Sequence, residues 1–458
     1  MLTPDTKSDL PDCLFRDLDF STGAVAAVSG GSDSTALLLL LKDHLDRTAS
    51  AARLLAVTVD HGLRPGSAAE ARLVANFCAE RGIEHRILTW SGDKPLTGLA
   101  AAARAARYNL LAAAAEAESI KLILTGHTAD DQAETVLMRL ARDDDGRGLA
   151  GMAPATLYDW RTWIVRPLLG ARRAALREML RGRDIGWIED PTNVDTRFER
   201  PRLRATLALP DGEQRIAEAL ARAGQAALER EDLGHRAAVL IEAFASRSVP
   251  GLIRLDRDFA AHDDGKAAIY ALRILLATVG GVSFLPDEAR CAALLSRLRS
   301  ASLRATLSRT AVDARRTGIF LHRENRNLPA PAPPATNEFW DNRRRITLND
   351  RLGGLVIAPL GPAAARQAPL SDAVPASLSR AALAAEPSLE SGVERLDFAG
   401  GKADPQPVSI APVVTPFARF LPCFDLEPAT AVGVLVGAPP PVAPPFLGHD
   451  GGRGWAKA

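Results

Sequence analysis

A short run of serine and glycine near the N-terminus has the composition of an anion-binding loop. It comprises Ser29, Gly30, Gly31, Ser32, Asp33 and Ser34. The glycines allow successive backbone N–H groups to converge on an anion, and the hydroxyl groups can donate hydrogen bonds to phosphate oxygens. A carboxylate among these donors would repel phosphate unless a cation lies between them, and Mg²⁺ with Asp33 as its ligand would resolve that conflict. The run therefore predicts a phosphate-binding loop.

A second set of polar residues could provide acid–base or metal chemistry. Four side chains are spaced to share one face at the start of a helix: His127, Asp130, Asp131 and Glu134. Such a cluster can bind a divalent metal, act as acid and base, or only cap the helix. We favour a functional role for His127 and Asp131, whereas helix capping remains an equal alternative for Asp130.

Two further pairs of residues are ambiguous on their own. Arg104 and Arg107 lie one turn apart on an alanine-rich segment. From spacing alone, two arginines that solvate a helix are the better explanation. Asp60 and His61 follow a predicted strand; a lone histidine is more often structural, but this pair can also line a nucleotide pocket.

These polar clusters follow predicted strands. Apolar runs predict strands at residues 24–28, 54–59, 85–88 and 121–124, and helical patterns alternate with them at residues 34–45, 67–81, 98–118 and 128–142. Such alternation implies a parallel sheet with helices on both faces, and ligands of these sheets lie at the carboxyl ends of the strands. The sequence therefore predicts an α/β domain with a doubly wound, Rossmann-like parallel sheet over residues 1–210.

The loop at residues 29–34 differs from the common nucleotide-binding fingerprints. A Walker A loop needs Gly-Lys-Ser/Thr, and the dinucleotide fingerprint needs GxGxxG spacing. Neither is present here. The simplest alternative is an ordinary serine–glycine turn that caps the following helix. The coincidence with the other two clusters favours phosphate binding.

The pattern changes beyond residue 210. Residues 211–246 and 266–299 have helical periodicity. We therefore expect a mainly helical middle domain over residues 211–327. Residues 303–323 within it read as a hairpin or two short strands.

The last part of the chain is rich in proline. A Pro/Ala linker at residues 328–336 precedes strand-like runs at 340–359 and 407–436. These runs predict a small β-rich C-terminal domain over residues 338–447. Residues 448–458 are expected to form a disordered tail.

Arginine is concentrated between Arg166 and Arg204. This segment holds ten arginines against six acidic residues, in a chain whose formal net charge is only +1. Guanidinium groups suit phosphate oxygens, and Trp160 and Trp163 could stack on an unpaired base. A solvated helix face with core tryptophans is the alternative for any single residue. As a patch the segment favours RNA binding, with the following candidate contacts: Arg172, Arg173, Arg202 and Arg204.

Composition limits the classes of protein. The chain has 458 residues, of which 47% are hydrophobic and 24% charged, as in a soluble globular protein of two or three domains. Its four cysteines include no CxxC pair, which argues against a zinc ribbon or a thioredoxin-like site. No apolar run reaches the roughly 18 residues of a membrane span, and the N-terminus lacks the pattern of a signal peptide. We therefore expect a cytoplasmic protein that does not enter a membrane.

The motifs resemble those of a known family. Residues 29–34 resemble the SGGxDS signature of the PP-loop ATP pyrophosphatases, which cleave ATP between the α- and β-phosphates. Residues 59–64, 104–108 and 126–135 are similar to the VDHGLR, ARxxRY and GHxxDDQxET motifs of the tRNA(Ile)-lysidine synthase family within that group. The resemblance continues through Arg166-Pro167-Leu168-Leu169 and the Trp187–Asn193 segment, and covers residues 21–210.

The resemblance implies a two-step reaction on tRNA(Ile) with a CAU anticodon. O2 of the wobble cytidine attacks the α-phosphate of ATP, and pyrophosphate leaves. The amine of free L-lysine then attacks C2 of the base and expels AMP, which leaves lysidine. The resemblance gives Asp33, Arg107, His127 and Asp131 as catalytic residues.

We expect Asp131 to accept the proton of the lysine amine, whose ordinary pKa is about 10.4. His127 would contact the α-phosphate region and Arg107 a phosphate. ATP would be bound by Ser29–Ser34 together with Asp60 and His61, with Mg²⁺ at Asp33. Arg104 is left without an assigned role.

The chain departs from the family pattern at two places. Asp143, Asp144 and Asp145 stand where relatives have a Gly/Ser-rich stretch with arginine, and Arg200-Pro201 replaces an Arg-Asn pair. Contacts to RNA inferred at these places are therefore insecure. The sequence also leaves the oligomeric state open, a homodimer included.

Two other functions share the same loop. A tRNA thiolase generally needs a reactive or cluster-binding set of cysteines, which four scattered cysteines do not supply. A catalytically silent RNA-binding protein on a PP-loop scaffold would not need Asp33, Arg107, His127 and Asp131 together. The presence of all four residues favours an enzyme.

Overall fold

The computed structural model of the chain describes residues 14–48, 51–142, 146–190, 195–300, 302–336, 338–348, 354–369, 374–391, 394–396 and 408–448. It divides into two compact units. The first contains residues up to Glu231 together with 422–424 and the segment from Val442 onward, and the second contains 232–421 and 425–441. The predicted bounds 1–210, 211–327 and 338–447 remain predictions, and the tail predicted at 448–458 lies, apart from Gly448, outside the described residues.

The first unit is built on a sheet with a parallel core. Its strands are β1 (Ala24–Ala27), β2 (Leu54–Asp60), β3 (Glu84–Thr89), β4 (Leu122–Thr125), β5 (Ala155–Tyr158) and β6 (Thr162–Val165). They follow one another in the order β5-β6-β4-β1-β2-β3. Every neighbouring pair is parallel except β5 and β6, which form an antiparallel hairpin. The α/β fold with a parallel sheet is confirmed, and the antiparallel hairpin β5–β6 is an addition to it.

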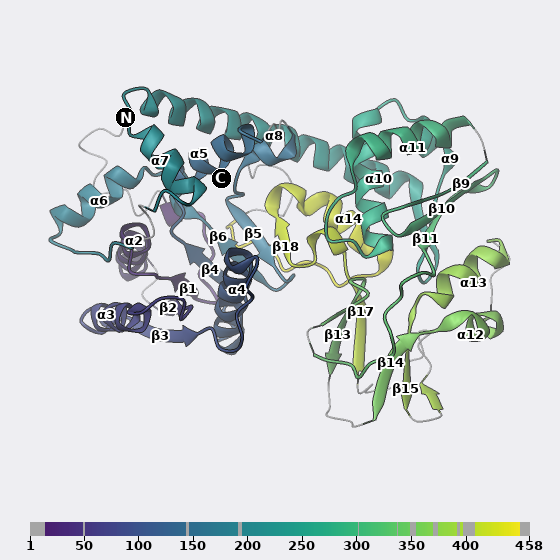
Figure 1. Cartoon of the computed structure of the whole chain (residues 1–458), viewed down its shortest axis with the longest axis horizontal. Helices are drawn as coiled ribbons and strands as arrows, with labels where there is room; N and C mark the ends of the chain where they lie inside the picture. The colour runs from purple at the N-terminus through teal and green to yellow at the C-terminus, as the bar shows by residue number, and fades with distance from the viewer. Residues whose placement is uncertain are drawn as a thin grey trace. The chain divides into compact units, whose positions relative to one another are not determined.

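The helices of this unit connect the parallel strands. They are α2 (Ser32–Thr48), α3 (Ser67–Ala79), α4 (Leu99–Ala117) and α5 (Ala129–Leu140), followed by α6 (Arg173–Gly182) and α7 (Glu199–Leu207). Figure 1 shows α2 and α3 on one side of the strands and α4 on the other. This is the doubly wound arrangement that the alternating pattern predicts. It places the starts of α2 and α5 at the same edge of the sheet, after β1 and β4.

Two short 3-10 helices lie outside the predicted elements of this unit. They are η2 (Arg147–Ala150) and η3 (Pro167–Gly170). The hairpin β5–β6 that separates them contains Trp163, which is fully buried and donates its indole N–H to the carbonyls of Val442 and Ala443 at 3.1 and 2.8 Å. The prediction that Trp163 stacks on an RNA base is therefore wrong, because the ring is a core side chain.

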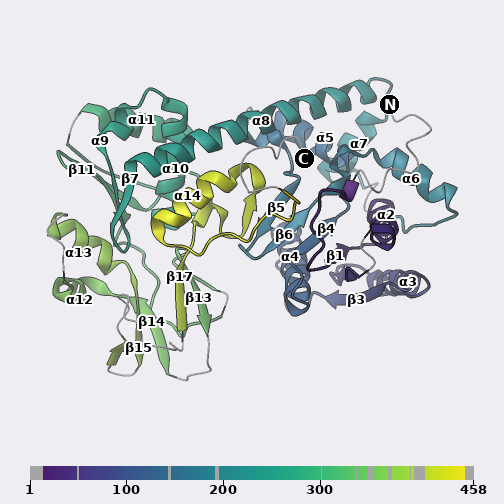
Figure 2. The same cartoon turned by 180° about the vertical axis from the view of Figure 1, so that it is seen from behind.

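The two ends of the described chain meet in the first unit. Asp19 N–H donates to the carbonyl of Pro445 at 2.9 Å, and Leu447 N–H donates to that of Asp17 at 2.7 Å. Residue 442 and those after it therefore complete a unit whose sheet is built from the first third of the sequence. The view from behind shows the start and the end of the described chain near one another in this unit (Figure 2).

The second unit begins within the long helix α8 (Gly212–Phe244). A five-stranded antiparallel sheet follows, in the order β7-β8-β11-β10-β9. Its strands are β7 (Ala245–Val249), β8 (Leu252–Leu255), β9 (Leu303–Leu307), β10 (Thr310–Arg315) and β11 (Gly318–Arg323). Residues 303–323 thus form three strands, and not the hairpin or two strands expected.

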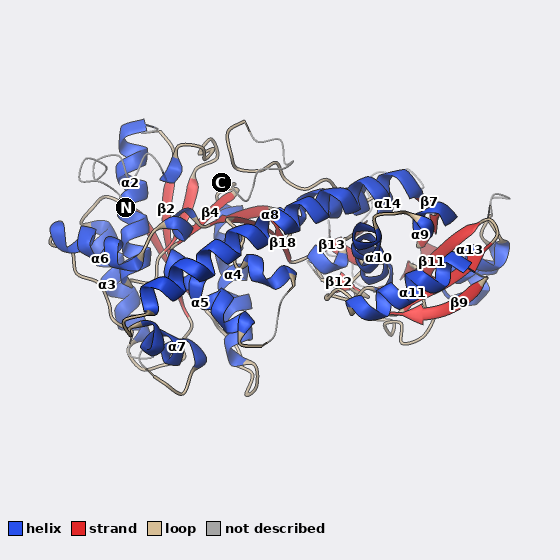
Figure 3. Cartoon of the chain, turned by 90° about the horizontal axis from the view of Figure 1, so that it is seen from above, coloured by secondary structure: helices blue, strands red, loops and turns tan. Residues whose placement is uncertain are grey.

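Three helices accompany this sheet. They are α9 (Arg257–Ala261), α10 (Gly265–Gly280) and α11 (Glu288–Ser300). The Asp264 carboxylate accepts from the Ala267 N–H at 3.0 Å and caps the start of α10, and Gly281 with φ +67° ends it. Figure 3 shows these helices in blue beside the red strands. The helical middle region is confirmed, and the helical pattern at 266–299 corresponds to the two helices α10 and α11.

Small antiparallel sheets form the rest of the second unit. One contains β12 (Phe339–Trp340), β13 (Arg344–Leu348) and β17 (Val408–Pro412), and the other β14 (Leu355–Pro359), β15 (Pro387–Ser391) and β16 (Glu394–Leu396). The remaining elements of this unit are α12 (Gly361–Gln367), α13 (Ala376–Ala384), η5 (Thr415–Phe417) and α14 (Leu426–Val436). β18 (Phe420–Pro422) and η6 (Cys423–Asp425) include residues 422–424, which belong to the first unit. The β-rich character of this part is confirmed.

A buried ionic cluster accounts for the arginine triplet at residues 343–345. The Asp341 carboxylate accepts from Arg309, Arg323 and Arg343 at 2.5, 3.0 and 2.8 Å, and Arg343 also donates to Glu386 at 2.7 Å. The triplet lies in the β12–β13 hairpin, and Arg343 is only 3% exposed. Burial of Arg343 in this cluster makes it a structural residue of the hairpin.

No helix in the described ranges combines the length and the apolar character that a membrane crossing requires.

Candidate active site

A cavity of about 720 Å³ opens at the carboxyl ends of β1 and β4. Its walls come from the loop before α2, the start of α5, the start of α6, and α7. Of the predicted catalytic residues, all four line it: Asp33, Arg107, His127 and Asp131. The three sequence motifs that carry them therefore meet in space, as the topology of a doubly wound sheet requires.

The loop at residues 29–34 is closed on itself by hydrogen bonds. Ser34 Oγ accepts from the Ser29 N–H at 3.1 Å, lies 3.1 Å from Ser29 Oγ, and donates to the Gly31 carbonyl at 3.1 Å. Helix α2 starts at Ser32, so its unpaired N–H groups border the cavity. This arrangement preorganises an anion site of the kind predicted for the loop.

Gly30 is the position in this loop that only glycine can occupy. Its φ is +84°, and a Cβ there would lie 2.6 Å from Cδ1 of Ile188. The Ile188 N–H donates to the Gly30 carbonyl at 2.8 Å, which fixes the loop beneath the segment that follows α6. Gly31 has no positive φ and no atom closer than 3.7 Å to its Cβ position. Of the two glycines, Gly30 thus carries the conformational requirement.

Gly126 brings the end of β4 against the start of α2. A Cβ at Gly126 would lie 2.9 Å from the carbonyl oxygen of Asp33 and 3.0 Å from the N atom of Ser34. These are backbone atoms, which cannot turn away as a side chain can. The close approach therefore sets the distance between the phosphate loop and His127.

We expect Gly126→Ala to weaken ATP binding about tenfold, because the added methyl group pushes the start of α2 away from β4. The measurement is the equilibrium dissociation constant of ATP by calorimetry. Gly182→Ala is the matched control, since no atom lies within 4 Å of a Cβ at Gly182. Unchanged ATP affinity in Gly126→Ala would show that the loop tolerates displacement.

His127 is held as a neutral imidazole. Its Nδ1 lies 2.9 Å from Thr125 Oγ1. Burial, with Arg166 and Arg107 nearby, lowers the pKa of His127 from 6.5 to about 3. The ring can therefore offer hydrogen bonds to a phosphate but adds no positive charge near pH 7.

This depressed pKa predicts a loss of stability in acid. Between pH 6.5 and pH 3 the unfolded chain binds a proton at this histidine and the folded chain does not, so falling pH favours unfolding. At pH 5 the penalty is about 1–2 kcal/mol, at about 1.4 kcal/mol per pKa unit. We expect His127→Gln to lose less unfolding free energy than the parent protein between pH 8 and pH 5 in urea titrations. Equal losses in both proteins would contradict a neutral His127.

Asp131 serves both the helix and the cavity. Its Oδ2 accepts from the N–H and the Oγ1 of Thr128, each at 2.9 Å, which forms a capping box at the start of α5. Its Oδ1 accepts from Nη2 of Arg173 at 2.8 Å. Burial raises the pKa of Asp131, but Arg173 and the bonds from Thr128 outweigh this and hold the pKa below its usual value. One carboxylate oxygen is thus structural and the other faces the cavity.

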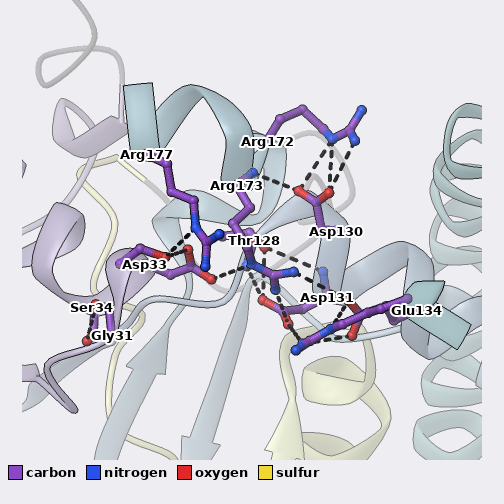
Figure 4. A network of polar contacts seen from close by, with 12 residues as sticks. Gly31, Asp33, Ser34, Thr128, Asp130, Asp131, Glu134, Arg172, Arg173 and Arg177 are labelled. Carbon is purple, nitrogen blue, oxygen red and sulfur yellow. Dashed lines mark hydrogen bonds and ion pairs between the residues drawn. The ribbon is translucent and has the colours of Figure 1, made fainter. Parts of the chain in front are cut away.

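Arg173 connects the phosphate loop to the start of α5. Its Nε donates to Oδ2 of Asp33 at 2.8 Å, while Nη2 donates to Asp131. Nη1 lies 3.5 Å from Glu134, which also accepts from Arg204 Nε at 2.7 Å. Figure 4 shows the Arg173 side chain between the two aspartates. Two arginines and three carboxylates therefore form one charged network, of which Glu134 is buried behind the cavity wall and the other four side chains line the cavity.

Arg107 reaches the same cavity without a carboxylate partner among the described residues. Burial, and then the nearby Arg104, lower the pKa of Arg107. Arg104 is exposed and lies over the Tyr108 ring, 4.9 Å from its centroid. Arg107 lies over the same ring, 6.0 Å from its centroid, and of the predicted pair it is the arginine that lines the cavity.

Asp60 and His61 lie beside the cavity and are not part of its lining. Asp60 accepts from the Gly62 N–H at 2.9 Å, which stabilises the turn after β2. His61 packs edge-on against Trp90, with 6.0 Å between ring centroids. Both have structural contacts of their own, and their role in ATP binding stays a prediction.

The four predicted tRNA contacts occupy two different environments. Arg173 and Arg204 line the cavity and are paired with acidic residues. Arg172 is paired with Asp130 and Glu213, and Arg202 donates to the backbone carbonyls of Thr196 and Arg197 at 3.0 Å each. Their contacts to RNA stay predictions, and the structure adds a place at the catalytic site for the first pair.

Three further side chains belong to the site without a role among the predictions: Glu134 is placed only on the helix face of His127, and Arg177 and Arg200 are counted only in the arginine-rich segment. Glu134, 2% exposed at its side chain, sits beside Asp131 in the charged network. Arg177 Nε lies 3.2 Å from Ser32 Oγ, and Arg200 is a further lining residue. The spacing of Glu134 from His127 was a usable signal. Nothing in the local sequence of Arg177 or Arg200 distinguishes them from the other arginines.

The described cysteines are buried thiols with no feature that would make them reactive. Cys78, Cys291 and Cys423 are buried, and burial raises the pKa of both the Cys78 and the Cys291 thiol to about 11. Cys13 and the acidic triplet Asp143–Asp145 lie outside the described residues. Within the described ranges no cluster of three or more histidine, cysteine or acidic side chains could hold a metal ion.

Comparison with known proteins finds similar sequences over most of the chain. A family model described as a PP-loop domain matches residues 12–210. The tRNA(Ile)-lysidine synthase of Mesorhizobium japonicum is 63% identical over 97% of this chain and 99% of its own length. That of Rhizobium meliloti is 38% identical over 93% of this chain and 94% of its own. Among solved structures, a U34-tRNA thiolase from Methanococcus maripaludis covers 48% of this chain and 78% of its own, with 19% identity and a TM-score of 0.38.

Proposed function

The chain belongs to the tRNA(Ile)-lysidine synthase family, and from this premise we propose that it joins lysine to C2 of the wobble cytidine of tRNA(Ile) at the cavity described above. ATP is consumed and released as AMP and pyrophosphate. The observation that carries the proposal is the meeting of Asp33, Arg107, His127 and Asp131 in one cavity at the phosphate loop.

The first step needs stabilisation of negative charge on the polyphosphate. O2 of the cytidine forms a bond to the α-phosphorus, and the bond to the bridging oxygen of the β-phosphate breaks. The N–H groups and hydroxyls of residues 29–34 hold the departing pyrophosphate. Arg107 supplies positive charge with no competing carboxylate, and neutral His127 donates a hydrogen bond near the α-phosphate.

The residues present fit Mg²⁺ that arrives with ATP. A site formed by the protein alone would need several acidic ligands, and the described residues offer no such cluster. Mg²⁺ in ATP sites commonly takes one or two carboxylates and completes its shell with phosphate oxygens and water. Asp33, at the start of α2 in the phosphate loop, is the carboxylate that would hold it. When bound, the ion neutralises charge on the phosphates.

The second step needs a neutral amine. Lysine Nε forms a bond to C2 of the cytidine, the bond from C2 to the AMP oxygen breaks, and AMP leaves. Asp131 takes the amine proton through Oδ1, since its Oδ2 is engaged by Thr128. The low pKa that Arg173 imposes on Asp131 opposes this role as long as the two remain paired.

Incubation of the pure protein with ATP, labelled lysine and total tRNA tests the proposal. Label in the RNA supports lysidine formation. AMP without label in the RNA favours another PP-loop tRNA-modifying enzyme such as a thiolase. Absence of AMP favours a non-catalytic RNA-binding protein on the same scaffold.

A further inference from the structure

One guanidinium group holds both acidic residues on which the proposed chemistry depends. Arg173 Nε donates to Asp33 and Arg173 Nη2 donates to Asp131, each at 2.8 Å. The side chains of Arg173, Asp33 and Asp131 are 19%, 19% and 12% exposed. These are partly buried, charge-assisted bonds, which are stronger than surface ion pairs.

The same bonds conflict with the roles of their partners. Asp33 is needed as a ligand of the ion that accompanies ATP, and the Asp131 oxygen bonded to Arg173 is the one that faces the cavity. As long as Arg173 donates to Asp131, an incoming lysine ammonium must compete with it for the same oxygen. A fixed Arg173 would therefore block the second step.

The position of Arg173 allows its side chain to move without its backbone. It is the first residue of α6, and its N–H is anchored to Asp130 Oδ2 at 2.7 Å. Its guanidinium lies in the cavity that residues 29–34 also line. A polyphosphate bound there would present several oxygens to the same fork of donors, with more negative charge than one carboxylate.

We propose that Arg173 is an ATP-responsive positioning residue: it holds Asp33 and Asp131 in the nucleotide-free protein and transfers to the phosphates of ATP when ATP binds. The transfer releases Asp33 toward the metal ion and Asp131 toward the lysine amine. This inference rests on the proposed function and adds an order to it, in which ATP prepares the site for lysine.

The transfer predicts energetic coupling between the two substrates. ATP removes the competitor of lysine at Asp131, so lysine binds more tightly when ATP is bound, and linkage requires the reverse to hold equally. We expect at least about a tenfold change in lysine affinity. Arg204 Nη2 lies 3.6 Å from the same Asp131 oxygen, beyond hydrogen-bond distance, and donates to Glu134 at 3.1 Å. Without the Arg173 guanidinium, the hydrogen-bonded competitor of lysine is therefore absent both with and without ATP, and the coupling disappears.

Calorimetry with Mg²⁺ and α,β-methylene ATP, which cannot be cleaved at the α–β bond, tests this without catalysis. The lysine dissociation constant is measured with and without the analogue in the parent protein, Arg173→Gln and Arg173→Lys. Arg161→Gln is the matched control, because Arg161 pairs with Glu116 on the surface, outside the cavity. Thermal unfolding confirms that each variant is folded.

We expect the ATP analogue to tighten lysine binding in the parent protein and in the Arg161→Gln control, and to have no effect on it in Arg173→Gln. In Arg173→Lys the coupling should be smaller than in the parent, because a single ammonium cannot bridge both carboxylates. Arg173→Gln also binds the ATP analogue about tenfold more weakly, because Asp33 and Asp131 then face the phosphates without Arg173. Unchanged coupling in Arg173→Gln overturns the proposal, as does absence of coupling in the parent protein. Absence of coupling in the parent protein can be observed without any variant. If the parent nevertheless forms lysidine in the labelling assay, this inference has failed and the proposed function has not.

Discussion

Asp131→Asn is expected to lower the rate of lysine transfer by about 10³-fold while the tRNA is still adenylated. A general base typically contributes 10²–10⁴-fold, and an amide cannot accept the amine proton at neutral pH. The variant should fold, because the amide oxygen can replace Oδ2 in the capping box with Thr128. Transfer of labelled lysine to isolated adenylated tRNA measures the second step alone.

Asp43→Asn is the matched control for this experiment. It makes the same chemical change at an aspartate on α2 that pairs with Arg183 at 2.6 Å and does not line the cavity. We expect this variant to transfer lysine at the parental rate. Full lysine transfer by Asp131→Asn would remove Asp131 as the base.

Arg107→Ala is expected to slow adenylation by about 10²–10³-fold, the range seen when one group that stabilises transition-state charge is removed. Because Arg107 has no acidic partner in the described structure, its removal leaves no carboxylate unpaired. The cost should therefore fall on catalysis, with little loss of folding stability. Release of pyrophosphate from ATP in the presence of tRNA measures the first step.

Arg104→Ala provides the comparison for Arg107. It removes an exposed arginine one turn earlier on α4, outside the cavity lining. A change of less than about threefold is expected there. Similar losses in both variants would point to a shared effect on α4 and its contact with Tyr108, and would count against a specific role for Arg107.

The core of the site was predictable because its determinants are local. The phosphate loop, its strand and its helix lie within residues 24–48, and the succession of strands and helices along the chain follows from the alternation of patterns. Residues 29–34 and 126–131 both follow strands of a parallel sheet, and the carboxyl ends of such strands lie at the same edge. The sequence alone therefore predicts that the two segments lie together. The bounds of β2 and α4 lie within one residue of those predicted. The agreement is close because the turn residues at the ends of these elements are easily recognised in a sequence.

The arginines of the site could not be assigned in the same way. Arg173 meets Asp33 across 140 positions of sequence. An arginine-rich segment has the same composition whether its guanidinium groups face RNA phosphates or buried carboxylates. Only the fold distinguishes Arg173 and Arg204, which turn into the cavity, from Arg202, which bonds to its own loop.

Several short strands were the other feature of the fold that the sequence did not predict. β5, β6 and β8 have four residues each, too few for a period of two to stand out. Trp163 illustrates the difficulty: an aromatic residue in an arginine-rich segment fits RNA stacking, yet it fills the core beside β4.

The closure of the first unit by residues near the C-terminus has a consequence for biosynthesis. Trp163 and Asp19 find their hydrogen-bond acceptors at residues 442–445, which are translated only after the whole second unit. A nascent chain emerging from the ribosome must hold the sheet of the first unit without these acceptors during synthesis of about 200 further residues, at roughly 5–20 residues per second. The second unit is thus inserted into the first in the order of translation, and the ATP-handling unit is the first to start folding and the last to finish.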